Sequence, residues 1–165
     1  MSDILYSPWR LDYILSKKDD GCIFCLKPNA NDDKKHLILY RSKLSFVIMN
    51  LFPYNNGHLM VVPNRHVSRL ADLNNDELAD LMHLAQLSEK VMQKIYSPDG
   101  FNLGMNIGKA GGAGIEAHLH LHIVPRWSGD TNFFSVTNGT RVIPEQFEAS
   151  YSKLKEAFDN ETKKK

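Results

Sequence analysis

The amino-acid sequence predicts an α+β domain with about five mostly antiparallel strands, one long helix between the third and fourth strands, and a C-terminal helix. Three features support this prediction: short apolar runs bounded by turn residues, a long stretch with helical spacing, and a segment in which apolar residues alternate with histidines. The chain has 165 residues, of which 42% are hydrophobic and 24% charged, which suits a single core.

The first three strands are expected at residues 36–40, 44–50 and 58–62. The first two are apolar runs joined by the tight turn Arg41-Ser42-Lys43, which favours an antiparallel pair. Residues 51–57 contain Pro and Asn-Gly and therefore predict an irregular crossing to the third strand, which Pro63 closes.

The long helix is expected at residues 77–96, because its apolar side chains recur at helical spacing and Asn74 to Asp76 can cap its start. A turn at 97–100 leads into a fourth strand at 101–107, and an amphipathic helix follows from Pro144-Glu145 to Phe158. We expect one domain over residues 1–160, with an N-terminal arm, and a disordered tail at 161–165.

The fifth strand, expected within residues 116–126, carries the most informative pattern. Successive side chains of a strand point to opposite faces, so His118, His120 and His122 share one face while the intervening apolar residues share the other. Imidazole acts near neutral pH as nucleophile, general acid or base, and metal ligand. The face therefore predicts a chemical site, either a nucleophilic one or a three-histidine catalytic metal site.

The overall charge and composition exclude several functions. A net charge of +1 provides no broad field for nucleic acid or for a membrane surface. No run approaches the roughly 20 apolar residues of a membrane span, and the N-terminus lacks a basic and then apolar signal sequence. We therefore expect a cytoplasmic protein that binds neither nucleic acid nor membrane.

The two cysteines of the chain form the motif Cys22-Ile23-Phe24-Cys25. A Cys-x-x-Cys pair in a cytosolic chain indicates metal or redox chemistry rather than a structural disulfide. Two thiolates make half of a tetrahedral zinc site, while a redox pair needs a strand before it and a helix after it. Zinc binding, redox chemistry and plain buried thiols all remain open from these residues alone.

The segment before the triad is rich in glycine, with Gly108, Gly111, Gly112 and Gly114. It lacks the Walker pattern, because Lys109 precedes most of the glycines. A flexible hairpin loop is one interpretation. The other is a phosphate cradle, in which the bare backbone N–H groups of Gly111, Gly112 and Gly114 face the histidines.

The run His118-Leu-His120-Leu-His122-Ile-Val resembles the signature of the histidine triad (HIT) family, in which three histidines alternate with apolar residues. The resemblance implies a HIT-like fold, a homodimer, and nucleotidyl transfer or hydrolysis in which His120 attacks a nucleotide α-phosphate. It groups His118 and His122 with His120 in the catalytic set. No divalent metal is required at the reacting centre of this scheme.

The resemblance extends to residues outside the triad. It implies a structural zinc held by Cys22, Cys25, His66 and His118. It places Asn50 on the ribose hydroxyls, His58 near the phosphates, and Asn106 among the polar site residues. Read without the resemblance, Asn50 is a strand-end cap and His58 a half-exposed strand residue.

Residues 125–134 and 139–144 are similar to the branch of the family that includes bacterial diadenosine tetraphosphate phosphorylases. Many hydrolases and phosphoramidases of the family carry Gly-Gln-Ser/Thr before the triad, whereas this chain has Ala113-Gly114-Ile115. The resemblance therefore implies cleavage of a dinucleoside polyphosphate, with phosphorolysis favoured over hydrolysis. The alternatives are a nucleoside phosphoramidate hydrolase and a nucleotide-binding protein without turnover.

Overall fold

The computed structural model of the protein describes residues 21–26, 32–132, 137 and 142–163. Within them, five antiparallel strands form one sheet in the order β1-β2-β3-β5-β4. The strands are β1 (Ile38–Arg41), β2 (Ser45–Met49), β3 (Leu59–Pro63), β4 (Gly100–Gly104) and β5 (Leu121–Arg126). The α+β prediction is confirmed, and the expected N-terminal arm lies outside the described residues.

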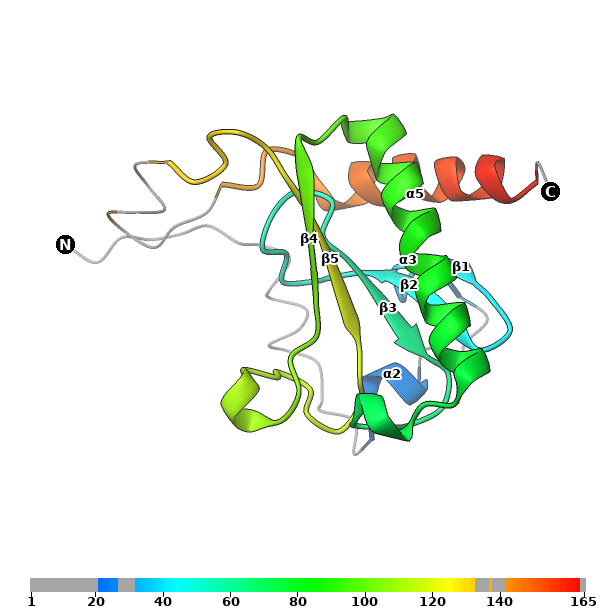
Figure 1. Ribbon diagram of the computed structural model, residues 1–165. Helices are drawn as coiled ribbons and strands as arrows, with labels where there is room; N and C mark the ends of the chain where they lie inside the picture. The colour runs from blue at the N-terminus through cyan, green and yellow to red at the C-terminus, as the bar shows by residue number, and fades with distance from the viewer. Residues whose placement is uncertain (1–20, 27–31, 133–136, 138–141, 164–165) are drawn as a thin grey trace.

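The helices are α2 (Ile23–Leu26), α3 (Asn75–Tyr96) and α5 (Phe147–Thr162), with short 3-10 turns η1 (Leu70–Asp72) and η2 (Lys109–Gly111). Figure 1 shows α3 packed across the sheet and α2 near the start of β5. As predicted, α3 lies between the third and fourth strands. Within the described segments, none of the helices is long and apolar enough to span a bilayer.

The start and end of α3 follow from local sequence. Asn74 and Glu77 form a capping box, in which the Asn74 side chain accepts from the Glu77 N–H and the Glu77 carboxylate accepts from the Asn74 N–H, both at 2.9 Å. The helix ends at Tyr96, and the next residue, Ser97, has a left-handed backbone with φ +44°. Both boundaries lie within two residues of the predicted ones.

The two faces of the sheet bury different apolar clusters. Alternate residues such as Val47, Val61 and Ile123 pack with α3 and α5 in the main core. A second cluster lies on the other face, where strand residues pack with Phe24 of α2. Its strand members are Ile38, Phe46, Ile48, Met60 and Val62. The histidines share this second face, because His122 lies opposite Met60 in the sheet.

Two elements end three or more residues away from the predicted position. The fourth strand ends at Gly104 instead of 107, because its ladder with β5 ends where Gly104 faces His122. The C-terminal helix runs on to Thr162, so the predicted disorder of the tail is wrong for residues 161 and 162. Glu161 pairs with Lys90 at 2.6 Å and also with Lys94 of α3, which holds the last turn in place.

Candidate active site and metal site

The three triad histidines are buried, with 0%, 4% and 8% of their surfaces exposed at His118, His120 and His122. His122 lies in β5 opposite Met60, whose side chain belongs to the cluster beside α2. Its neighbour Leu121 points into the core under the helices. The ring centroids of His120 and His122 are 4.7 Å apart, so these imidazoles are neighbours on one face.

The predicted fifth strand is wrong for residues 116–120, because the regular strand begins at Leu121. The backbone N–H of Leu119 donates to the carbonyl of Val67 at 2.6 Å, and Nε2 of His118 donates to the carbonyl of Pro63 at 2.9 Å. The start of the triad therefore bonds to the loop after β3, and this contact brings His66 towards His118.

His118 forms a cluster with both cysteines and with His66. Since His118 donates through Nε2, its Nδ1 carries the lone pair, and Nδ1 lies 3.3 Å from Sγ of Cys22 and 3.5 Å from Sγ of Cys25. Nδ1 of His66 lies 3.2 Å from Sγ of Cys25. One ligand atom from each of the four residues lies within 4.8 Å of every other.

This geometry fits zinc. With Zn–S bonds of about 2.3 Å and Zn–N bonds of about 2.0 Å, neighbouring ligands of a tetrahedral site lie roughly 3.5 Å apart. The sulfur–nitrogen distances of 3.2 to 3.5 Å match that spacing. The carbonyl of Pro63 is the outer partner that fixes the His118 tautomer, as is usual for a metal-bound histidine.

His120 is oriented by the backbone of the triad itself. Its Nδ1 lies 2.9 Å from the carbonyl of His118 and must donate to it, because a carbonyl only accepts. The lone pair of the neutral ring is therefore on Nε2, and an atom with such a lone pair can act as a nucleophile.

His58 and His122 form a directional pair. The backbone N–H of Tyr54 donates to Nδ1 of His58 at 3.0 Å, so the proton of the neutral ring is on Nε2. That Nε2 donates to Nδ1 of His122 at 2.9 Å, which leaves the His122 proton on Nε2. Among the described residues, no group bonds to this buried Nε2–H. It is a buried donor beside His120.

Burial keeps these imidazoles neutral. It lowers the pKa of His58 to about 3, with further lowering from the charges of His122 and His120. Burial likewise lowers the pKa of His122 to about 4, and it lowers the pKa of His120 and of His118. At neutral pH all four rings are uncharged, which the lone pairs on Nδ1 of His118 and Nε2 of His120 require.

The position of His58 near the phosphates stays a prediction. His58 is 1% exposed, and both of its ring nitrogens have protein partners. It therefore fixes the tautomer of His122. The Asn50 side chain lies 3.2 Å from Nδ1 of His58 and accepts from the N–H of Phe52 at 3.0 Å, so it braces the loop after β2. Its ribose contact stays a prediction.

The glycine-rich segment forms a compact turn. The N–H of Gly111 donates to the carbonyl of Gly108 at 3.2 Å, and the N–H of Gly112 donates to the carbonyl of Lys109 at 3.0 Å. Two of the three proposed phosphate donors are thus engaged within the turn, and Gly114 follows it as an exposed residue. Asn106 is half-buried just before the turn, where its carbonyl carbon is 3.9 Å from the Cβ position of Gly111.

Two aromatic residues that contact the histidines were not predicted from the sequence. Phe24 is fully buried, and its ring centroid lies 5.5 Å from that of His118 and 5.3 Å from that of His120. Its position between the two cysteines could have indicated that it lies near the site. The ring of Tyr54 lies 4.5 Å from that of His58 and 5.5 Å from that of His122. No periodic pattern marked Tyr54, because it lies in an irregular loop.

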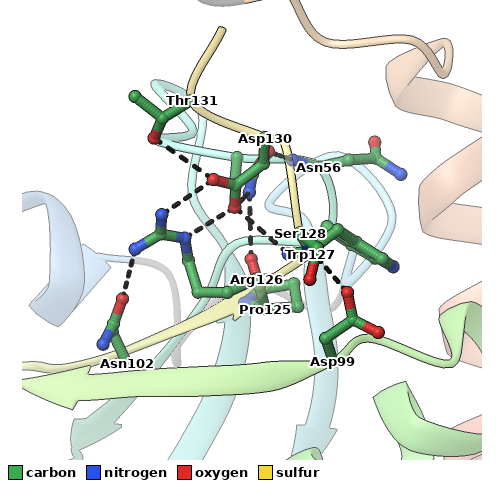
Figure 2. Close-up of polar contacts among 10 residues, drawn as sticks. Asn56, Asp99, Asn102, Pro125, Arg126, Trp127, Ser128, Asp130 and Thr131 are labelled. Carbon is green, nitrogen blue, oxygen red and sulfur yellow. Dashed lines mark hydrogen bonds and ion pairs between the residues drawn. The ribbon is translucent and has the colours of Figure 1, made fainter.

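A buried carboxylate at the end of β5 was also missed. Figure 2 shows Asp130 with two hydrogen bonds from Arg126, Nε to Oδ2 at 2.6 Å and Nη2 to Oδ1 at 2.7 Å. Asn55 donates to the same carboxylate at 2.8 Å and to the carbonyl of Pro125 at 3.1 Å. The hydrogen bonds from Arg126 hold the pKa of Asp130 well below its usual range. The loop before His58 is therefore tied to the strand that carries His122.

Comparisons with known proteins agree with this geometry. Residues 31–129 match the family model described as "HIT domain". The chain is 41% identical over 150 residues to the "AP-4-A phosphorylase" of Mycobacterium tuberculosis (strain ATCC 25618 / H37Rv), covering 86% of this chain and 76% of that protein. It is 39% identical to the "Bis(5'-nucleosyl)-tetraphosphatase [asymmetrical]" of Schizosaccharomyces pombe, covering 56% of this chain and 50% of that protein.

Among solved structures, a zinc-bound histidine triad family protein from Mycobacterium smegmatis superposes with a TM-score of 0.69 at 26% identity, covering 87% of this chain and 97% of that one. A histidine triad nucleotide-binding protein from Sulfolobus tokodaii strain7 superposes with a TM-score of 0.68, also at 26% identity, covering 87% and 95%. With the family model spanning more than half of the sequence, the chain belongs to the histidine triad (HIT) family.

Proposed function

We propose that this protein cleaves dinucleoside polyphosphates by transferring a nucleotidyl group to His120. The observation that carries the proposal is the chain of hydrogen bonds that leaves a lone pair on Nε2 of His120 and a buried N–H on Nε2 of His122. A nucleophile beside a preorganised donor is the arrangement that attack on a phosphate requires. The activities named for the M. tuberculosis and S. pombe relatives support the choice of substrate.

In the first half of the reaction, the lone pair of His120 Nε2 forms a bond to the α-phosphorus. The bond from that phosphorus to the bridging oxygen breaks, and its electron pair leaves with the second nucleotide. The Nε2–H of His122 donates to a phosphate oxygen, and His58 holds the His122 ring in the tautomer that makes this N–H available. The product is a nucleotidyl-histidine.

In the second half, an acceptor attacks the same phosphorus and the bond to His120 breaks, which restores the free imidazole. We propose inorganic phosphate as the preferred acceptor over water. One support is the phosphorylase named among the relatives. The other is Ala113-Gly114-Ile115, because many hydrolases and phosphoramidases of the family carry Gly-Gln-Ser/Thr at this place and this chain lacks those side-chain donors.

Incubation with diadenosine tetraphosphate tests the acceptor. With inorganic phosphate we expect ADP and ATP in equal amounts, because phosphate takes the adenylyl group that His120 holds. Anion-exchange chromatography of the products measures this, with a matched reaction in chloride at the same ionic strength. AMP and ATP in both reactions would contradict phosphorolysis. Release of AMP from adenosine 5′-phosphoramidate alone would support the phosphoramidate alternative, and binding without turnover would support the non-catalytic one.

We also propose that Cys22, Cys25, His66 and His118 hold a structural zinc. The fit of the four ligand atoms and the zinc-bound relative of known structure support this. Zinc bound there would clamp the thiolates of α2 to the start of the triad. Two neighbouring residues support these ligands: the carbonyl of Pro63 orients His118, and Phe24 packs on both His118 and His120.

A homodimer is the assembly that we propose, formed through the outer edge of β4. Within the described residues, β4 pairs on one side with β5 and ends the sheet, and its Leu103 is 45% exposed. An unpaired edge strand is a template for pairing with a second chain. Sedimentation equilibrium should give twice the chain mass of 18.8 kDa for the wild type. A single chain mass for the wild type would refute it.

The cytoplasmic location stays a prediction.

A further inference from the structure

Asp130 carries a buried carboxylate to which the proposed reaction gives no role. It follows the end of β5, and its side chain is 8% exposed. Arg126 donates to both carboxylate oxygens, and the N–H of Trp127 donates to Oδ2 at 3.2 Å (Figure 2). The hydrogen bonds from Arg126 hold the pKa of Asp130 well below its usual range, so the group is an anion at neutral pH. Several donors therefore fix the position of this charge.

Asn55 connects this carboxylate to the loop between β2 and β3. Through Nδ2, its side chain donates to Oδ2 of Asp130 at 2.8 Å and to the carbonyl of Pro125 at 3.1 Å. Its Oδ1 accepts from the N–H of Asn56 at 3.1 Å, and the residue is 9% exposed. The side-chain amide therefore donates only to acceptors at or just after the end of β5. The position of the loop depends on these acceptors.

The same loop supplies two groups that donate to Nδ1 of His58. One is the backbone N–H of Tyr54, at 3.0 Å. The other is the Asn50 side chain: because its Oδ1 accepts from the N–H of Phe52, its Nδ2 faces Nδ1 of His58, at 3.2 Å. Together they place the His58 proton on Nε2, which donates to Nδ1 of His122 at 2.9 Å. The tautomer of His122 therefore depends on where this loop lies.

We infer that Asp130 is a positioning residue for His122, acting through Asn55 and the loop between β2 and β3. Without the carboxylate, Asn55 loses a charged acceptor, and the loop no longer holds both donors against Nδ1 of His58. The His58 proton then also occupies Nδ1, in which case its Nε2 accepts and His122 donates through Nδ1. Each ring keeps one proton, but Nε2 of His122 then carries a lone pair in place of the N–H. The effect on the rate rests on the proposed function, in which that N–H donates to a phosphate oxygen.

Two variants that break the link from opposite ends test the inference. Asp130→Ala removes the acceptor, whereas Asn55→Ala removes the donor and leaves the ion pair between Asp130 and Arg126 in place. Proton–nitrogen correlation spectra of protein with isotope-labelled histidines show which ring nitrogen carries the proton, and His122→Ala assigns the ring. We expect the proton of His122 on Nε2 in the wild type and a population on Nδ1 in each variant. The double variant should show no further change, because both substitutions break one link.

The rate of diadenosine tetraphosphate cleavage is the second measurement. Loss of one preorganised donor costs about 10²- to 10³-fold in kcat, so a partial loss in either variant should lower kcat about tenfold or more. KM should change less than about twofold, because the donor acts on charge that develops in the transition state. Asp99→Ala is the matched control and should change neither measurement. Asp99 is an exposed carboxylate that accepts from the N–H of Ser128 at 2.6 Å (Figure 2).

The spectra and the rates separate the possible failures. If Asp130→Ala does not fold, Asn55→Ala decides, because it keeps the ion pair. A His122 proton that stays on Nε2 in the folded variants would overturn the inference, and so would a tautomer shift with unchanged kcat. The same losses in Asp99→Ala would overturn it as well, because they would reflect a general weakening of this region. Absence of turnover in the wild type would instead refute the proposed function, and the spectra would still report the tautomer.

Discussion

Replacing His120 with alanine is expected to lower kcat/KM for diadenosine tetraphosphate by about 10⁴-fold or more. Removal of a nucleophile costs this much because the residual rate comes only from binding and from the remaining donors. His120 supplies the lone pair at Nε2, and its hydrogen bond to the His118 carbonyl gives it the required tautomer. No other described imidazole is both adjacent to the buried donor of His122 and oriented in this way.

The intermediate provides the second measurement. Wild-type protein mixed with substrate in the absence of phosphate, and then denatured rapidly at alkaline pH where the P–N bond survives, should gain the mass of one adenylyl group in a mass spectrum. His120→Ala should gain none. His83→Ala is the matched control, because His83 is an exposed histidine of α3 and should leave both the rate and the label unchanged. Full activity of His120→Ala, or equal labelling of both variants, would refute the mechanism.

Replacing either cysteine with serine is expected to abolish stoichiometric zinc binding and to destabilise the fold. Cys22 and Cys25 supply two of the four ligand atoms, and a serine hydroxyl is a poor zinc ligand. Structural zinc contributes directly to folding free energy. For a domain of this size each kcal/mol corresponds to about 2–4 °C in Tm, so a fall of at least several degrees should follow.

Metal analysis of purified protein and thermal unfolding followed by circular dichroism measure these effects. The wild type should carry one zinc per chain after incubation with zinc and dialysis, whereas Cys22→Ser and Cys25→Ser should carry almost none. His83→Ala controls for the loss of a histidine outside the cluster. One tightly bound zinc in both cysteine variants would contradict the assignment. If His122→Ala lost the metal instead, the three-histidine metal site would replace it.

Local patterns were enough to predict the elements of the fold. The alternation at Leu121 and His122 separates the core side from the site side of β5, and the pairing with Met60 bears this out. The capping residues at Asn74 predicted the start of α3. Such signals succeed because periodicity and capping depend on residues within one or two turns of each other. The predicted ends of β4 and α5 were wrong, because contacts with residues distant in sequence determine that these elements end at Gly104 and Thr162.

The sequence by itself therefore determined the sheet, the long helix, the face that the histidines share, and the residues from which a site is built. Only the tertiary structure decided which ring nitrogen of each imidazole carries the proton. The chain brings Cys22 to His118 across 96 residues, and His58 to His122 across 64. A neutral histidine has one donor and one acceptor, and which nitrogen is which depends on its hydrogen-bond partners. Because most of those partners come from other strands and loops, spacing along the chain cannot assign the tautomers on which the proposed roles depend.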